Sequence, residues 1–182
     1  MNVISTNIAN PREVIWKGTP EITGIYKVPV DVLTIKKYFV EGDTVSDLRV
    51  HGCENKAVYG YPSEHYPFWQ DEFPRMKMPW GTFGENITTE GLLENDIVIG
   101  SVYRVGSALL QVTQPRMPCY KLAARFGTSS MIRRFMKSLK SGFYFTVLEE
   151  GTVKPGNPIT LEKVGETGHT IVDVVKSREE SE

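Results

Sequence analysis

Cys119 is the residue of this chain whose surroundings point most clearly to chemistry. It lies in the stretch QPRMPCYKLAARF, after a proline and a few residues from the cationic side chains of Arg116, Lys121 and Arg125. Nearby cations favour the thiolate form of a cysteine. We expect a helix to begin at about Pro118, and the first turn of a helix favours a thiolate as well. The local sequence therefore allows a metal ligand or a nucleophile here, although a lone cysteine is more often a small buried side chain.

Metal and nucleotide sites of familiar types have no support in this sequence. The chain has two cysteines, Cys53 and Cys119, and three histidines, His51, His65 and His169, which lie far apart. No C-x-x-C or H-E-x-x-H spacing occurs, so a zinc site of the usual kind is not expected. Neither a P-loop nor a G-x-G-x-x-G stretch occurs, so nucleotide binding by those routes is not expected either.

The composition is that of an ordinary globular protein, with no bias toward a polymer or a membrane. The 182 residues carry a formal net charge of -1, with 40% hydrophobic and 24% charged side chains. We therefore expect one domain over residues 1–182 and no nucleic-acid polymer as a partner. No apolar run is long enough to span a membrane, and the N-terminal residues lack the charged and apolar regions of a signal peptide. The sequence favours a cytoplasmic protein without a membrane partner.

Frequent glycines divide the middle of the chain into short apolar runs. They punctuate residues 78–114 and are Gly81, Gly84, Gly91, Gly100 and Gly106. Short strands separated by glycines are typical of a barrel or a sandwich, and the segment before residue 50 is strand-like too. The sequence predicts a mainly β fold, a closed β-barrel with two or three flanking α-helices.

Helical patterns are confined to two stretches. Residues 61–73 predict a short helix, although Pro67 argues against a regular helix through its middle. Helical signals return over residues 119–140, where Ser129 or Ser130 can cap a helix and Gly142 can stop it. The apolar residues there share one helical face and are Met131, Ile132, Phe135, Met136 and Leu139. The charged tail, about residues 175–182, is expected to fray.

Two further groups of side chains are expected to have structural roles. The basic side chains of residues 133–140 predict a solvated helix face. Aromatic residues near position 60 predict core and helix packing rather than a substrate-binding surface, and they are Tyr59, Tyr61, Tyr66, Phe68 and Trp69.

Four stretches taken together resemble one protein family. In order along residues 22–164, they are GIYKVPV, HGCENKAVYGYPSEHYPFW, FGENITTEGL and GSVYRVGSALLQVTQPRMPCYKLAARF. They resemble the MOSC family, named for the C-terminal domain of molybdenum cofactor sulfurase, and most of all its stand-alone bacterial members that reduce N-hydroxylated bases such as 6-hydroxylaminopurine. The resemblance implies a β-barrel and a molybdenum–pterin cofactor whose metal is held by the cysteine of P-R-x-P-C, which is Cys119.

The resemblance implies further site residues. His51 would act beside Cys119, although a hydrogen bond to a loop carbonyl explains it equally well. Glu85 and Asn86 belong to the F-G-E-N motif, although such side chains often only close a turn. The cofactor phosphate needs cations and amide N–H groups, and the physical argument does not choose among Lys56, Arg116, Lys121, Arg125 and the amides near Gly84. The residues expected to bind the cofactor are Lys56, Gly84, Glu85, Asn86, Gln114, Arg116 and Lys121.

This sequence departs from the family pattern in two places. Cys53 replaces the second glycine after His51, which adds a side chain and a second thiol at that position. The stand-alone bacterial members that the chain resembles also carry a small helical segment after the barrel, whereas here the sequence ends with GHTIVDVVKSREESE, residues 168–182. We expect any role of that segment, such as docking of an electron donor, to be affected.

The resemblance implies a molybdenum-dependent enzyme that reduces the N–OH bond of a small N-hydroxylated compound. The sequence has no flavin or nicotinamide motif, so electrons are expected from a separate redox protein. One alternative is a sulfur-carrier or cofactor-handling module, in which Cys119 carries a persulfide or binds the cofactor for delivery. Another is a barrel of this type that binds no cofactor.

Overall fold

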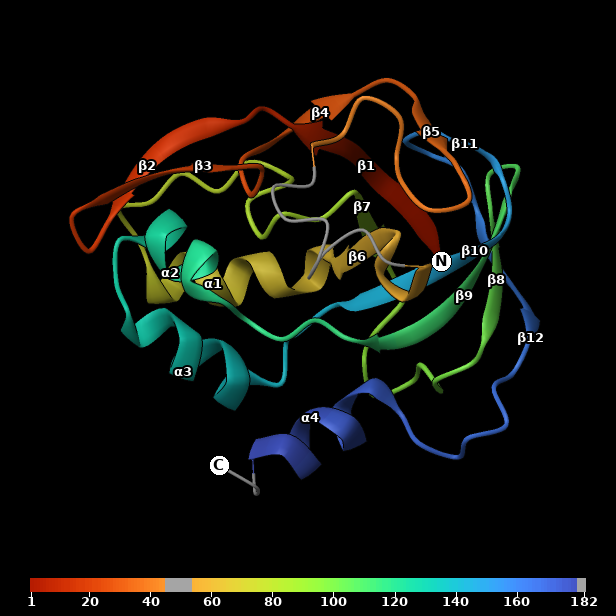
Figure 1. Ribbon diagram of the computed structural model, residues 1–182. Coiled ribbons are helices and arrows are strands. Elements are labelled where there is room, and N and C mark those ends of the chain that lie inside the picture. The colour runs from red at the N-terminus through yellow and green to blue at the C-terminus, as the bar shows by residue number, and fades with distance from the viewer. Residues whose placement is uncertain (45–53, 180–182) are drawn as a thin grey trace.

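A large mixed β-sheet with helices beside it forms the framework of the protein (Figure 1). The structure, a computed structural model, describes residues 1–44 and 54–179. The strands are β1 (Asn2–Ala9), β2 (Arg12–Trp16), β3 (Thr19–Thr23), β4 (Lys27–Val30), β5 (Leu33–Ile35), β6 (Val58–Pro62), β7 (Ile87–Glu90), β8 (Val102–Val105), β9 (Ala108–Pro115), β10 (Phe143–Glu149), β11 (Gly151–Val153) and β12 (Ile159–Lys163). The helices are η1 (Glu54–Lys56), η2 (Ser63–His65), α1 (Tyr66–Glu72), α2 (Tyr120–Phe126), α3 (Ser130–Ser138) and α4 (Ile171–Glu179).

Eight strands form the main sheet, in the order β12-β8-β9-β10-β6-β7-β1-β4. Neighbouring strands are antiparallel except for β6 and β7, which are parallel. The prediction of a mainly β fold is confirmed. The closed barrel is not confirmed, because within the described residues the strand order of the sheet ends at β12 and at β4.

The first strand is also fixed by the segment that leads into β12. The N–H of Ile159 donates to the carbonyl of Met1 at 2.9 Å, and the N–H of Val3 donates to the carbonyl of Asn157 at 2.9 Å. An isolated bridge between Asn2 and Pro158 lies between these bonds. Backbone from opposite ends of the described chain therefore meets at the start of β1.

β6 is buried on both faces because it lies between two hydrophobic clusters. Val58 belongs to the cluster inside the sheet, whereas Tyr59 and Tyr61 belong to an aromatic cluster under the helices. Gly60 is required between them, because a Cβ at this position would lie 2.7 Å from the ring of Phe143. Such contacts are not tolerated in a packed core, so the strand holds its two tyrosines at fixed positions beside the helices.

The helices α1, α2 and α3 lie together beside the sheet and cover the aromatic cluster (Figure 1). Tyr61, Tyr66 and Trp69 are buried there, and the indole N–H of Trp69 donates to the hydroxyl of Tyr61 at 2.7 Å. Their predicted packing role is confirmed, whereas Phe68 is exposed. The predicted apolar face of α3 is confirmed as well, since its buried residues are Met131, Phe135 and Met136.

Helix boundaries differ from the prediction where turns are tight. The chain remains in β6 through Pro62, so the helix predicted over residues 61–73 begins only at Tyr66. Helix α2 ends at Gly127 in the left-handed conformation, with φ of 67°, which separates it from α3. Helix α3 ends before Leu139 rather than at the predicted Gly142, because Leu139 itself adopts a φ of 58°.

Residues 175–179, which belong to the tail predicted to fray, form the second half of helix α4 instead. Ile171 and Val175 are buried on its inner side. The backbone N–H of Thr170 donates to the carboxylate of Asp173 at 2.8 Å, and the N–H of Asp173 donates to the hydroxyl of Thr170 at 3.2 Å. This reciprocal capping starts the helix. The described residues hold four α-helices, where two or three were predicted, and none of these is long and apolar enough to cross a membrane.

Candidate functional site

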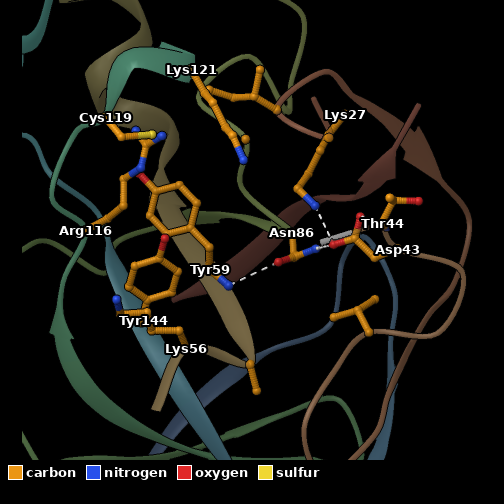
Figure 2. A pocket seen from close by; sticks show the side chains of 15 residues that line it. Lys27, Asp43, Thr44, Lys56, Tyr59, Asn86, Arg116, Cys119, Lys121 and Tyr144 are labelled. Carbon is orange, nitrogen blue, oxygen red and sulfur yellow. Dashed lines mark hydrogen bonds and ion pairs between the residues drawn. The ribbon is translucent and has the colours of Figure 1, made fainter. Parts of the chain in front are cut away.

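Six of the residues predicted to form the site line one pocket between the sheet and α2. They are Lys56, Gly84, Asn86, Arg116, Cys119 and Lys121. Figure 2 shows Cys119 beside Arg116 at one side of this pocket and Asn86 at the other. Lys56 comes from η1, Asn86 from the residue before β7, and Arg116 and Cys119 from the segment between β9 and α2. Side chains far apart in the sequence therefore meet at one place.

Cys119 occupies the position immediately before α2. Its backbone is extended, and its carbonyl accepts the N–H of Leu122 at 3.0 Å. The helix was expected to begin at about Pro118, so Cys119 caps the helix rather than lying within its first turn. Its side chain is half-buried and carries a free thiol that lines the pocket. The thiol is thus accessible to a ligand while its backbone is held by the start of the helix.

Arg116 is a buried cation with an unused hydrogen-bond donor. The residue is only 6% exposed, and its Nη1 atom has no hydrogen-bond partner among the described residues. Its guanidinium carbon lies 5.3 Å from the ring centre of Tyr59 and 5.4 Å from that of Phe135. Buried polar groups are nearly always hydrogen-bonded, and a bare donor at a pocket points to a bound acceptor.

A lysine and an aspartate that sequence reasoning missed form the opposite side of the pocket. Lys27 forms an ion pair with Asp43, and Asn86 donates to the same carboxylate at 2.7 Å (Figure 2). The Oδ1 atom of Asn86 in turn accepts the backbone N–H of Tyr59 at 3.1 Å. Asn86, predicted from the F-G-E-N motif, therefore joins the ion pair to strand β6.

Gly84 and Glu85 lie next to Asn86 but have different surroundings. Gly84 lines the pocket with a φ of 84°, and its N–H already donates to the carbonyl of Gly81 at 3.0 Å. Glu85 is fully buried outside the pocket lining. Its carboxylate accepts hydrogen bonds from the hydroxyl groups of Tyr66 and Thr88. It also accepts the backbone N–H groups of Gly81 and Phe83. Burial raises the pKa of Glu85, and these hydrogen bonds oppose that effect.

We expect Glu85→Ala to lower the free energy of unfolding by about 3 kcal/mol, because the buried N–H groups of Gly81 and Phe83 lose their acceptor. Glu85→Gln keeps one oxygen and should cost less. Denaturant unfolding followed by circular dichroism measures both. Glu90→Ala, at an exposed carboxylate nearby, is the control and should change stability by no more than about 0.5 kcal/mol. Unchanged stability of Glu85→Ala would contradict the structural role.

Gln114 and Arg125 lie outside the lining of this pocket. Gln114 pairs with Tyr144 in the β9–β10 register but is absent from the pocket lining. The guanidinium carbon of Arg125 lies 4.2 Å from the ring centre of Tyr26, and the side chain borders a different pocket. His51 and Cys53 lie outside the described residues.

The described lining of the pocket carries more positive than negative charge. Its cations are Lys27, Lys56, Arg116 and Lys121, whereas Asp43 is its one carboxylate. The rings of Tyr59 and Tyr144, 5.2 Å apart, form an apolar wall beside Arg116. A positive, partly aromatic pocket suits an anionic ligand that has a flat portion. Among the described residues, no group of three or more histidine, cysteine, aspartate or glutamate side chains is placed to hold a metal.

The chain is similar to known proteins in sequence and in fold. The family model for the MOSC domain matches residues 47–160. The uncharacterized protein YflK of Bacillus subtilis is 43% identical over 172 residues, which are 93% of this chain and 77% of that protein. The crystal structure of YiiM from Geobacillus stearothermophilus superposes with a TM-score of 0.81 at 34% identity, covering 99% of this chain and 84% of that chain.

A third relative carries a functional name. A protein of Gibberella moniliformis named "Reductase" is 34% identical over 114 residues, which are 61% of this chain. The matched region is only 20% of that longer protein. The likeness is therefore to one part of it.

Proposed function

Because this chain belongs to the MOSC domain family, we propose that it binds a molybdenum cofactor in the pocket at Cys119 and reduces N-hydroxylated compounds. The relative named "Reductase", which this chain matches over one part of its length, supports an oxidoreductase. The observation that carries the proposal is the unpartnered buried donor of Arg116 in the same pocket as the free thiol of Cys119.

The residues of the pocket fit such a cofactor. The thiol of Cys119 is a soft ligand of the kind that molybdenum accepts, and a metal that arrives within an organic cofactor needs few ligands from the protein. Arg116 offers an unused donor, and Lys56 and Lys121 add positive charge where a phosphate group would bind. When bound, the cofactor would supply two-electron redox chemistry.

The protein's own residues would bind and orient the reacting groups. The tyrosine wall offers a flat apolar surface to a small planar substrate. The hydroxyl of Tyr59 is already committed to the carbonyl of Ser141 at 2.8 Å, so this ring is held rigidly. Burial raises the pKa of Tyr59 well above its ordinary range, so the phenol stays neutral and adds no negative charge to the pocket. Electrons would come from a separate redox protein.

We expect the purified protein, made in a host that synthesises the cofactor, to show no activity with NADH or NADPH alone. Under anaerobic conditions with reduced viologen it should reduce 6-hydroxylaminopurine, because an artificial donor replaces the missing redox partner. Viologen oxidation is followed by absorbance with and without substrate, and the amine product is measured by chromatography.

Protein from a host unable to make the cofactor is the matched control and should be inactive. Absence of substrate-dependent oxidation across several hydroxylamines and N-oxides would contradict the reductase proposal. A persulfide on Cys119, detected by mass spectrometry in the same preparation, would then favour a sulfur carrier.

A further inference from the structure

We infer that Lys27, held in place by Asp43, is the proton donor that assists cleavage of the N–O bond in this pocket. The inference rests on the proposed reductase function. It assigns a role to a lysine and an aspartate on the side of the pocket away from Cys119 (Figure 2).

The ion pair is buried and lines the pocket. Lys27 is the first residue of β4, and its ammonium group contacts the Oδ2 atom of Asp43. The exposed fractions of the two side chains are 7% and 6%. Burying a lysine costs free energy, because its charge loses contact with water. This cost is offset only where the charge is paired or where the lysine has a function in the site.

Asp43 is fixed by so many donors that it positions Lys27 rather than acting as a base. Its Oδ1 atom accepts the backbone N–H of Ala9 at 2.6 Å and that of Thr44 at 3.1 Å. Its Oδ2 atom accepts Asn86 Nδ2 at 2.7 Å in addition to Lys27. With these acceptor positions occupied, the carboxylate is fixed in orientation against the ammonium group of Lys27.

The backbone around Gly81 restrains the stem of Lys27. Gly81 has a φ of 87°, and a Cβ there would lie 3.0 Å from the Cβ of Lys27 and 3.1 Å from its carbonyl oxygen. This close packing fixes the base of the side chain beside Gly81, and the ion pair fixes the ammonium end. The amine is thus held at one place on the wall of the pocket.

Burial of Lys27 favours proton release from its ammonium group. Burial lowers the pKa of Lys27, and the nearby carboxylates of Asp43 and Glu85 oppose that effect. The other cations of the pocket, Lys56, Arg116 and Lys121, add positive charge to the same space. An acid whose pKa lies closer to neutrality transfers its proton more readily.

Reduction of an N–OH group needs such a donor. Two electrons from the low-potential reductant enter the substrate as the N–O bond breaks. One proton, from Lys27, goes to the departing oxygen, which leaves as water. A second proton from solvent goes to nitrogen, giving the amine, and solvent then reprotonates Lys27. The reductant is oxidised by two electrons and the substrate is reduced by two.

The test compares Lys27→Met, Lys27→Arg and the control Lys137→Met, which changes an exposed lysine of α3. Lys27→Met should bind as much molybdenum as the wild type. Its kcat should be lower by about 100-fold or more, which is the usual contribution of a positioned acid. The wild-type rate should fall as pH rises through the pKa of Lys27, and Lys27→Arg should move this fall to higher pH. Lys137→Met should match the wild type in all measurements.

Other results would overturn the inference in distinguishable ways. Loss of molybdenum in Lys27→Met would make Lys27 a cofactor-binding residue. If the wild type is active and Lys27→Met is equally active, Lys27 is not the proton donor. The proposed reductase function would be unaffected by that result. A wild type that is loaded with molybdenum but reduces no hydroxylamine would contradict the proposed function itself, and the inference with it.

Discussion

Cys119→Ser protein is expected to be purified without molybdenum and without reductase activity. Loss of a residue that merely supports a metal ligand typically costs roughly 10–100-fold in affinity, so loss of the ligand itself should cost more. Serine is a favourable residue before a helix, and Cys119 stabilises α2 through its backbone carbonyl. The fold should therefore survive, and the loss can be assigned to the sulfur atom.

Cys53→Ser is the matched control for this experiment. It removes the other thiol of the chain, and we expect it to retain most of its molybdenum and activity. Elemental analysis, with circular dichroism to verify folding, measures both variants. Equal loss of molybdenum in the two variants would show that Cys119 has no special role.

Arg116→Ala is expected to weaken cofactor retention by about 10–100-fold, because hydrogen bonds to charged groups contribute about 1.5–3 kcal/mol. Arg116→Lys should recover only part of this, since lysine lacks the planar fork of arginine. Molybdenum retained through successive desalting steps is the measurement. Arg134→Ala is the control, because its side chain is 47% exposed and is paired with Glu72 on the surface.

The free energy of unfolding of the cofactor-free protein shows whether Arg116 binds the cofactor or only packs in the protein interior. Without an acceptor, Arg116 leaves a charged group buried with an unsatisfied donor. Arg116→Met keeps much of the side-chain volume and removes that charge, so it should be at least as stable as the cofactor-free wild type. A large loss of stability in Arg116→Met, or equal retention of cofactor in Arg116→Ala and Arg134→Ala, would make Arg116 a packing residue.

The sequence predicted the side of the pocket that is built from motifs. Arg116, Cys119 and Lys121 lie within one short stretch whose residue types already indicated chemistry. Lys27 and Asp43 were missed for different reasons. Lys27 lies in GIYKVPV, where a lysine in a strand gives no sign of the face that it occupies. Asp43 follows Gly42 in a polar stretch, and only the fold places it against Lys27.

Helix α4 was missed although its local signal was present. Thr170 and Asp173 have the spacing of a capping box, followed by apolar residues that include Val175. The charged residues after position 175 outweighed this signal. The backbone contacts between the start of β1 and the segment before β12, by contrast, have no local signal, because they join residues far apart in the chain.

The bonds between β1 and residues 156–159 also determine the order of events during synthesis. Val3 accepts the N–H of Gly156 at 2.8 Å, and Met1 accepts the N–H of Ile159 at 2.9 Å. β1 leaves the ribosome long before these partners exist. Its first residues can pair with β7 on one edge, but their other edge stays unpaired until residue 159 has followed. Pairing between distant segments slows folding and leaves a strand edge exposed in the meantime. For this chain, co-translational folding cannot finish from the N-terminus onward, and its first strand is among the last to be completed.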